Sequence, residues 1–145
     1  MPKVTYDSNI FIKYKPANLP AGFRLSVVVL QELLAGAKDS GETKELEAAY
    51  RNYKKASRLL VPDAEDWWLV GLVLNGLQRK RKSKKSGLIP KISIEEKYRI
   101  TNDVLIARTA RRAGVTLVTD NIRDFERIKN FCNVRLVKGS DFFKC

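Results

Sequence analysis

Apolar and polar positions along the chain predict short strands that alternate with helices. Five segments rich in β-branched or apolar residues have the character of strands, namely residues 3–6, 24–28, 59–61, 115–119 and 134–137. Helical spacing and capping signals mark residues 10–15, 29–38, 41–60, 64–78, 93–112 and 121–129. Because strands and helices alternate, the sequence predicts an α/β fold, a three-layer α/β/α arrangement around a mostly parallel sheet of about five strands.

One domain accounts for the whole chain of 145 residues, since no repeat and no long linker divides it. Asp63, with Asp66 three residues later, has the spacing of a capping pair at the start of the helix over residues 64–78. The next segment carries six cations in seven residues, followed by Ser86, Gly87 and Pro90, which predicts a basic loop at about residues 79–91.

Composition excludes several classes of function. The chain has no histidine, which removes Ser-His and Cys-His catalysis and histidine-ligated zinc. Its two cysteines are too few for a disulfide framework and fit a reducing cytoplasm. The longest apolar run, residues 67–74, is too short to span a membrane, and no signal-peptide core follows Met1. We therefore expect a cytoplasmic protein without a membrane segment.

The net charge points to a polyanionic partner. Twenty-eight Lys and Arg against 16 Asp and Glu leave a formal charge of +12, a field that attracts nucleic acid first and an anionic membrane surface second. The acids that such a basic chain retains therefore call for individual explanation.

Two acids follow predicted strands, where open α/β sheets bind ligands. Asp7 follows residues 3–6 and Asp120 follows residues 115–119. An aspartate at a strand-to-helix junction also serves as a helix cap, so each residue has a structural as well as a chemical interpretation.

Two further acids lie on apolar helix faces. Glu32 and Gln31 are the only polar residues between positions 27 and 37, and Asp103 lies along the stripe that Ile100 and Ala107 mark. A buried carboxylate requires a partner or a cation. Glu32 could instead reach solvent at the helix edge, and Asp103 could pair with neighbouring Arg99 or Asn102.

Together, these four acids can converge on one cleft. At a spacing of about 6 Å and an effective dielectric near 20, each pair of carboxylates repels by roughly 3 kcal/mol. Bound cations or protons must relieve this repulsion, and oxygen-only ligands favour Mg²⁺ or Mn²⁺. A divalent cation among carboxylates supports phosphodiester hydrolysis, so an acidic cleft in a basic protein indicates a nuclease.

The sequence resembles the PIN-domain nucleases, in particular the VapC-type toxins of toxin–antitoxin pairs. Four segments carry the resemblance in order, namely VTYDSNI at 4–10, SVVVLQELLAG at 26–36, TNDVLIA at 101–107 and TLVTDNIRDF at 116–125. It implies a single PIN-like domain over residues 1–145 and an endoribonuclease that depends on Mg²⁺ or Mn²⁺. A cognate antitoxin protein and a homodimer are implied as partners.

Site residues are carried over from the resemblance position by position. Asp7 and Asp103 match the most consistent metal ligands, and Glu32 matches the glutamate that binds metal or orients the attacking water. Asp120 matches the fourth acid, with Asp124 a second candidate in the same motif. The small polar neighbours that would support the carboxylates or the phosphate are Asn9 and Thr119.

The basic run is interpreted as an electrostatic clamp on RNA beside the cleft, and a solvated loop is the alternative. Its cations are Arg79, Lys80, Arg81, Lys82, Lys84 and Lys85. Trp67 and Trp68 could stack on bases, although Trp68 together with Leu72 is more typical of a core or dimer contact.

Other functions remain open at this point. The chain could be a PIN-type nuclease that processes RNA as housekeeping, or a non-catalytic nucleic-acid-binding α/β module whose acids are caps and ion pairs. A phosphoacceptor receiver domain fits less well, because it requires paired acids after the first strand and a phosphoacceptor after the third. This chain has single acids at Asp7 and Asp63.

Overall fold

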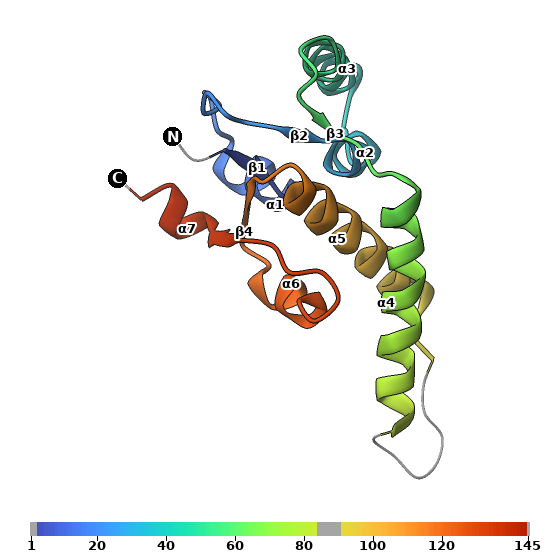
Figure 1. Cartoon of the computed structure of the whole chain (residues 1–145). Coiled ribbons are helices and arrows are strands. Elements are labelled where there is room, and N and C mark those ends of the chain that lie inside the picture. The colour runs from blue at the N-terminus through green and yellow to red at the C-terminus, as the bar shows by residue number, and fades with distance from the viewer. Residues whose placement is uncertain (1–2, 84–90, 145) are drawn as a thin grey trace.

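The computed structural model describes residues 3–83 and 91–144, and within them strands and helices alternate as expected (Figure 1). In chain order the elements are β1 (Val4–Tyr6), α1 (Ser8–Tyr14), β2 (Leu25–Ser26), α2 (Val27–Ala35), α3 (Ser40–Lys55), β3 (Leu59–Leu60), α4 (Ala64–Ser83), α5 (Ile94–Arg112), β4 (Thr116–Thr119), α6 (Ile122–Ile128), β5 (Leu136–Lys138) and α7 (Gly139–Phe142).

The short strands pair in parallel throughout. Strand β4 lies between β1 and β5, with Thr5 opposite Leu117 and Val118 opposite Val137. Strand β2 pairs with β3, and the Arg24 N–H, just before β2, donates to the Val4 carbonyl at 2.9 Å. The prediction of a mostly parallel sheet of about five strands is confirmed, with the strands divided between a three-stranded and a two-stranded ladder.

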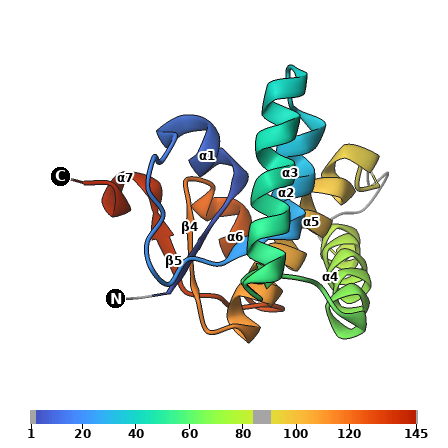
Figure 2. The same ribbon diagram turned by 90° about the horizontal axis from the view of Figure 1, so that it is seen from above.

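Apolar side chains fill a layer on each face of this sheet, because successive residues of a strand point to opposite sides. Leu117 packs into a core that α2, α4, α5 and α6 complete, whereas Val118 packs with β1, α1 and β2 on the other side. Figure 2 shows α7 on one side of the strands and α4 and α5 on the other. The three-layer α/β/α architecture is therefore confirmed.

A buried acidic side chain joins α4 to α5. Asp63 and Asp66 cap each other's backbone N–H groups at 3.0 Å, which confirms the predicted capping pair. The Asp66 carboxylate is fully buried and also accepts from Arg108 Nε at 3.0 Å and from Arg112 Nη1 at 2.6 Å. Burial alone would raise the pKa of Asp66, but the hydrogen bonds from Arg112 and the Asp63 N–H lower it.

The second strand is shorter than its sequence predicts. Ser26 Oγ accepts from the N–H groups of Val28 and Val29 at 3.2 and 3.4 Å and so caps α2. The prediction of a strand over residues 24–28 is wrong beyond Ser26, because this cap outweighs the β-propensity of the valines.

Helix lengths differ from the prediction at two other places. The helix expected over residues 41–60 ends at Lys55, and Ser57 adopts the left-handed conformation (φ 57°) before β3 begins. Helix α4 continues to Ser83, so the prediction of a loop is wrong for residues 79–83. Lysine and arginine are good helix formers, and their charge does not prevent the helix from continuing. Residues 84–90 lie outside the described residues.

The two tryptophans at the start of α4 lie at the surface. Trp67 is 56% exposed, Trp68 is 72% exposed and Leu72 is 49% exposed. The interpretation of Trp68 and Leu72 as core residues is therefore wrong. Within residues 3–83 and 91–144, no helix combines the length and apolar character needed to cross a membrane.

Candidate active site

Asp7 occupies the carboxyl end of β1 and both caps a helix and contributes to an acidic cluster. Its Oδ1 accepts from the Ser8 N–H at 2.9 Å, and its Oδ2 accepts from Asn9 Nδ2 at 3.0 Å and from Thr119 Oγ1 at 2.7 Å. The side chain is buried, which raises its pKa, and the charge of Asp124 raises it further against these hydrogen bonds. The two interpretations of Asp7 are thus compatible.

Asp103 is the centre of this cluster. Its position on α5 raises its pKa from 3.8 to about 8, first through burial and then through the charges of Asp7, Asp124 and Glu32. Arg127 on α6 acts in the opposite direction. Four carboxyl groups from β1, α2, α5 and α6 are therefore near enough to disfavour one another's ionisation. We call Asp7, Glu32, Asp103 and Asp124 the acidic cluster.

Glu32 contributes an oxygen without a partner. Its Oε1 is buried and has no hydrogen bond within the described part of the chain. Burial raises the pKa of Glu32, and the charge of Asp7 raises it further, while nearby Asn102 and Ser8 partly offset both effects. The alternative in which Glu32 reaches solvent is therefore wrong for this oxygen. A buried acceptor without a donor is costly and fits a site for a cation.

Asp120 and Asp124 occupy different surroundings. Asp120 accepts from the Tyr14 hydroxyl at 3.1 and 3.3 Å and pairs with Lys13 Nζ at 3.4 Å. Gly139 leaves room for it, because a Cβ there would lie 2.7 Å from Asp120 Oδ1. Asp124, by contrast, raises the pKa of both Asp7 and Asp103. The structure thus brings Asp124 to the acidic cluster and holds Asp120 against α1.

The supporting polar residues link β1 to β4. Asn9 Nδ2 donates to Asp7, and the Asn9 side-chain carbonyl accepts from the Asp120 N–H at 3.3 Å. Thr119 Oγ1 donates to Asp7 and accepts from the Asn121 N–H at 3.0 Å. Both side chains orient the carboxylate, as their place in the sequence motifs suggests.

The first part of the basic run, residues 79–83, forms the end of α4. Arg79 and Lys80 are exposed on its last turns, and Arg81 forms an ion pair with Glu96 of α5 at 2.6 Å. The side chain of Lys82 and all of Lys84 and Lys85 lie outside the described residues. Sequence reasoning missed Arg127, whose only signal is its place one helical turn after Asp124.

The donor set suits Mg²⁺ or Mn²⁺. All candidate ligands are oxygens, their mutual repulsion favours a cation, and Glu32 Oε1 lacks a donor. In the described part of the chain, no three carboxylates converge on one point that could hold an ion. Coordination by this cluster would therefore require side-chain rotations.

The chain is similar to known proteins of one domain family. The sequence model of the PIN domain matches residues 4–130. Curated protein sequences gave no match. The DNA-bound VapBC structure from Salmonella typhimurium has 26% identity, with a TM-score of 0.54 and coverage of 96% of this chain and 99% of that chain.

Two more distant structures share the fold alone. VapBC-1 from nontypeable Haemophilus influenzae has 20% identity and a TM-score of 0.55, with 94% and 98% of the two chains covered. FitAcB from Neisseria gonorrhoeae has 14% identity and a TM-score of 0.53, with 94% and 97% covered.

Proposed function

Because the chain belongs to the PIN-domain family, we propose that it is an endoribonuclease that depends on Mg²⁺ or Mn²⁺ and acts as the toxin of a toxin–antitoxin pair. The observation that carries the proposal is the acidic cluster, in which three other carboxyls and burial raise the pKa of Asp103 to about 8. Burying carboxyls next to one another is unfavourable, and a protein with a net charge of +12 has ample Lys and Arg to pair with them instead. Such clusters are typical of functional sites.

One group of residues would bind the cation, and a second group orients those ligands. Asp7 and Asp103 are the proposed metal ligands, with Glu32 completing the site through its unpartnered Oε1. We assign the fourth position to Asp124 in place of Asp120, because Asp124 interacts electrostatically with both Asp7 and Asp103. Asp120 then acts as a positioning residue that ties the start of α6 to α1.

A divalent cation at this site would activate water and offset the negative charge that develops on the phosphate during hydrolysis. The protein's own contribution is orientation. Thr119 and Asn9 fix the Asp7 carboxylate, while α5 fixes Asp103 and α2 fixes Glu32. The positive field draws the RNA backbone toward the acidic cluster, and the exposed Arg79 and Lys80 extend that field along α4.

The toxin role rests on the resemblance to VapBC complexes. The structures from Salmonella typhimurium and Haemophilus influenzae are of VapBC, and the former is bound to DNA. By analogy, we propose a cognate antitoxin protein and a homodimer for this chain. Expression of this chain should arrest growth, and co-expression of a small protein encoded beside it should restore growth. Growth arrest by Asp103→Asn equal to that by the wild type would contradict the proposal.

The direct test is cleavage of RNA by the purified protein. We expect wild-type protein to cut single-stranded RNA in Mn²⁺ or Mg²⁺ and not in EDTA, and Asp103→Asn to be inactive. Glu95→Gln is the matched control, because Glu95 is an exposed carboxylate on the same helix outside the cluster. Wild-type protein that binds RNA without metal-dependent cleavage would instead be a non-catalytic binding module.

A further inference from the structure

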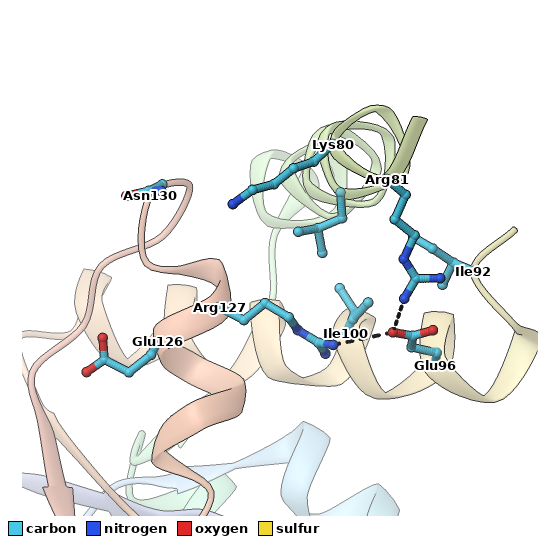
Figure 3. Close-up of a pocket in the computed structure, with 9 residues that line it drawn as sticks. Lys80, Arg81, Ile92, Glu96, Ile100, Glu126, Arg127 and Asn130 are labelled. Carbon is cyan, nitrogen blue, oxygen red and sulfur yellow. Dashed lines mark hydrogen bonds and ion pairs between the residues drawn. The ribbon is translucent and has the colours of Figure 1, made fainter. Parts of the chain in front are cut away.

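A cavity lies on two of the helices that carry the acidic cluster, α5 and α6. A cavity of about 330 Å³ opens between the end of α4, the start of α5 and the C-terminal part of α6 (Figure 3). Leu77, Ile92 and Ile100 give it an apolar lining, of which Ile92 and Ile100 are buried core residues. Charged and amide side chains surround this lining. Such a combination is typical of pockets for small organic groups.

Positive charge predominates around the cavity. Glu96 Oε2 accepts from Arg81 Nη2 at 2.6 Å and from Arg127 Nη1 at 3.4 Å, so one carboxylate pairs with two guanidinium groups. The side chain of Lys80 extends from α4 toward the same space (Figure 3). The other acid of the lining, Glu126, pairs with Lys129 at 3.3 Å.

The cavity and the acidic cluster share two helices. On α5, Glu96, Ile100 and Asp103 follow one another at spacings of four and three residues, which places them on one face. Seven residues of helix correspond to about 10 Å. On α6, Arg127 lies one turn after Asp124 and lowers the pKa of Asp103, so its charge acts on both sites. A chain that passes the acidic cluster can therefore reach the cavity.

We propose that this cavity is a nucleotide-binding subsite for single-stranded RNA, which receives one base next to the phosphate at the acidic cluster. The apolar lining supports the face of the base, and Arg81 and Arg127 exchange Glu96 for a backbone phosphate. The side chain of Asn130 at the rim (Figure 3) supplies an amide for the base edge. Single-stranded RNA suits such a pocket because its bases can be splayed from the strand. Only the identity of the ligand rests on the proposed function.

The test is binding of a fluorescein-labelled single-stranded RNA of mixed sequence, measured by anisotropy in EDTA. We expect Arg81→Ala to weaken binding about 10-fold, as for loss of a charge-assisted hydrogen bond. It should also lower the salt dependence by about 0.7 in slope. Arg51→Ala removes the same charge from an exposed site on α3, outside the cavity, and should change binding less than about 2-fold.

Two further variants separate a subsite from a general effect of charge or folding. Asn130→Asp places a negative charge at the rim and should weaken binding, whereas Asn52→Asp adds the same charge on α3 and should not. Glu96→Gln releases both guanidinium groups from their carboxylate and should tighten binding, a gain that misfolding cannot produce.

The outcomes also distinguish this inference from the nuclease proposal. If wild-type protein cleaves RNA but Arg81→Ala binds like Arg51→Ala and Asn130→Asp binds like Asn52→Asp, the subsite is overturned and the nuclease stands. If the cavity variants behave as expected but wild-type protein shows no metal-dependent cleavage, the subsite stands and the nuclease is overturned.

Discussion

Replacing Asp103 with asparagine should stabilise the metal-free protein, and increasingly so as pH rises. In the folded protein the pKa of Asp103 is raised from 3.8 to about 8 by burial and by three neighbouring carboxyls. The native state therefore keeps a proton that the unfolded chain releases near pH 4. Stability that is fully present below about pH 4 is lost progressively up to about pH 8. Asparagine is neutral throughout and removes this loss.

The size of the effect follows from the shift. About four pKa units at roughly 1.4 kcal/mol each correspond to ~6 kcal/mol at most. Because Asp103 retains some exposure, water screens part of the unfavourable interaction. We expect the Asp103→Asn protein to exceed the wild type by about 2–4 kcal/mol in free energy of unfolding at pH 8, and by only about 1 kcal/mol at pH 4.5.

Urea denaturation in EDTA between pH 4.5 and 8.5 measures this difference, with far-UV circular dichroism as the signal. Trp67 and Trp68 are 56% and 72% exposed, so tryptophan fluorescence would report folding poorly. Glu95→Gln on the same helix is the control and should show no such trend. A difference between Asp103→Asn and wild type that stays constant with pH would refute the reasoning, because the acids would then not share one site. Mn²⁺ should stabilise wild-type protein more at pH 8 than at pH 6.

Three further perturbations test other parts of the site and fold. Asp124→Asn should lower the rate of RNA cleavage at least about 100-fold, as for loss of a charged group that acts in the transition state. Asp120→Asn should lower that rate less than about 10-fold. Equal losses in initial-rate assays would contradict the assignment of the fourth acid. Asp66→Asn should destabilise the protein by about 3 kcal/mol in urea denaturation, because two arginines lose their buried partner; an unchanged midpoint would show that the network contributes nothing. Replacing the six cations of residues 79–85 by serine should reduce the slope of log affinity against log salt by about 4 on single-stranded RNA, and an unchanged slope would exclude these residues as a clamp.

The sequence was sufficient to locate the acids that come together, because their positions follow from local patterns. Asp7 is preceded by an unambiguous strand, and Asp103 lies on an apolar helical stripe. The different surroundings of Asp120 and Asp124 depend on Lys13 and Tyr14 of α1, which contact Asp120 from more than 100 residues away. No local pattern contains that information.

Helix ends and the cavity were harder to predict for related reasons. The six cations and the Gly and Pro that follow them have the composition of a loop. Lys and Arg nevertheless have high helix propensity, and α4 continues to Ser83. The partnership of Glu96 with Arg81 and Arg127 depends on how three helices approach one another. The sequence alone assigns each of these residues an ordinary place on a solvated helix face.

The parallel pairing of β1 with β4 has a consequence for synthesis of the protein. Asp7 is translated 112 residues before its hydrogen-bond partner Thr119, and Asp124 comes later still. A chain still attached to the ribosome therefore cannot bring the acidic cluster together until residue 124 has emerged. Under the proposed function, the nascent polypeptide would spare the messenger RNA that encodes it.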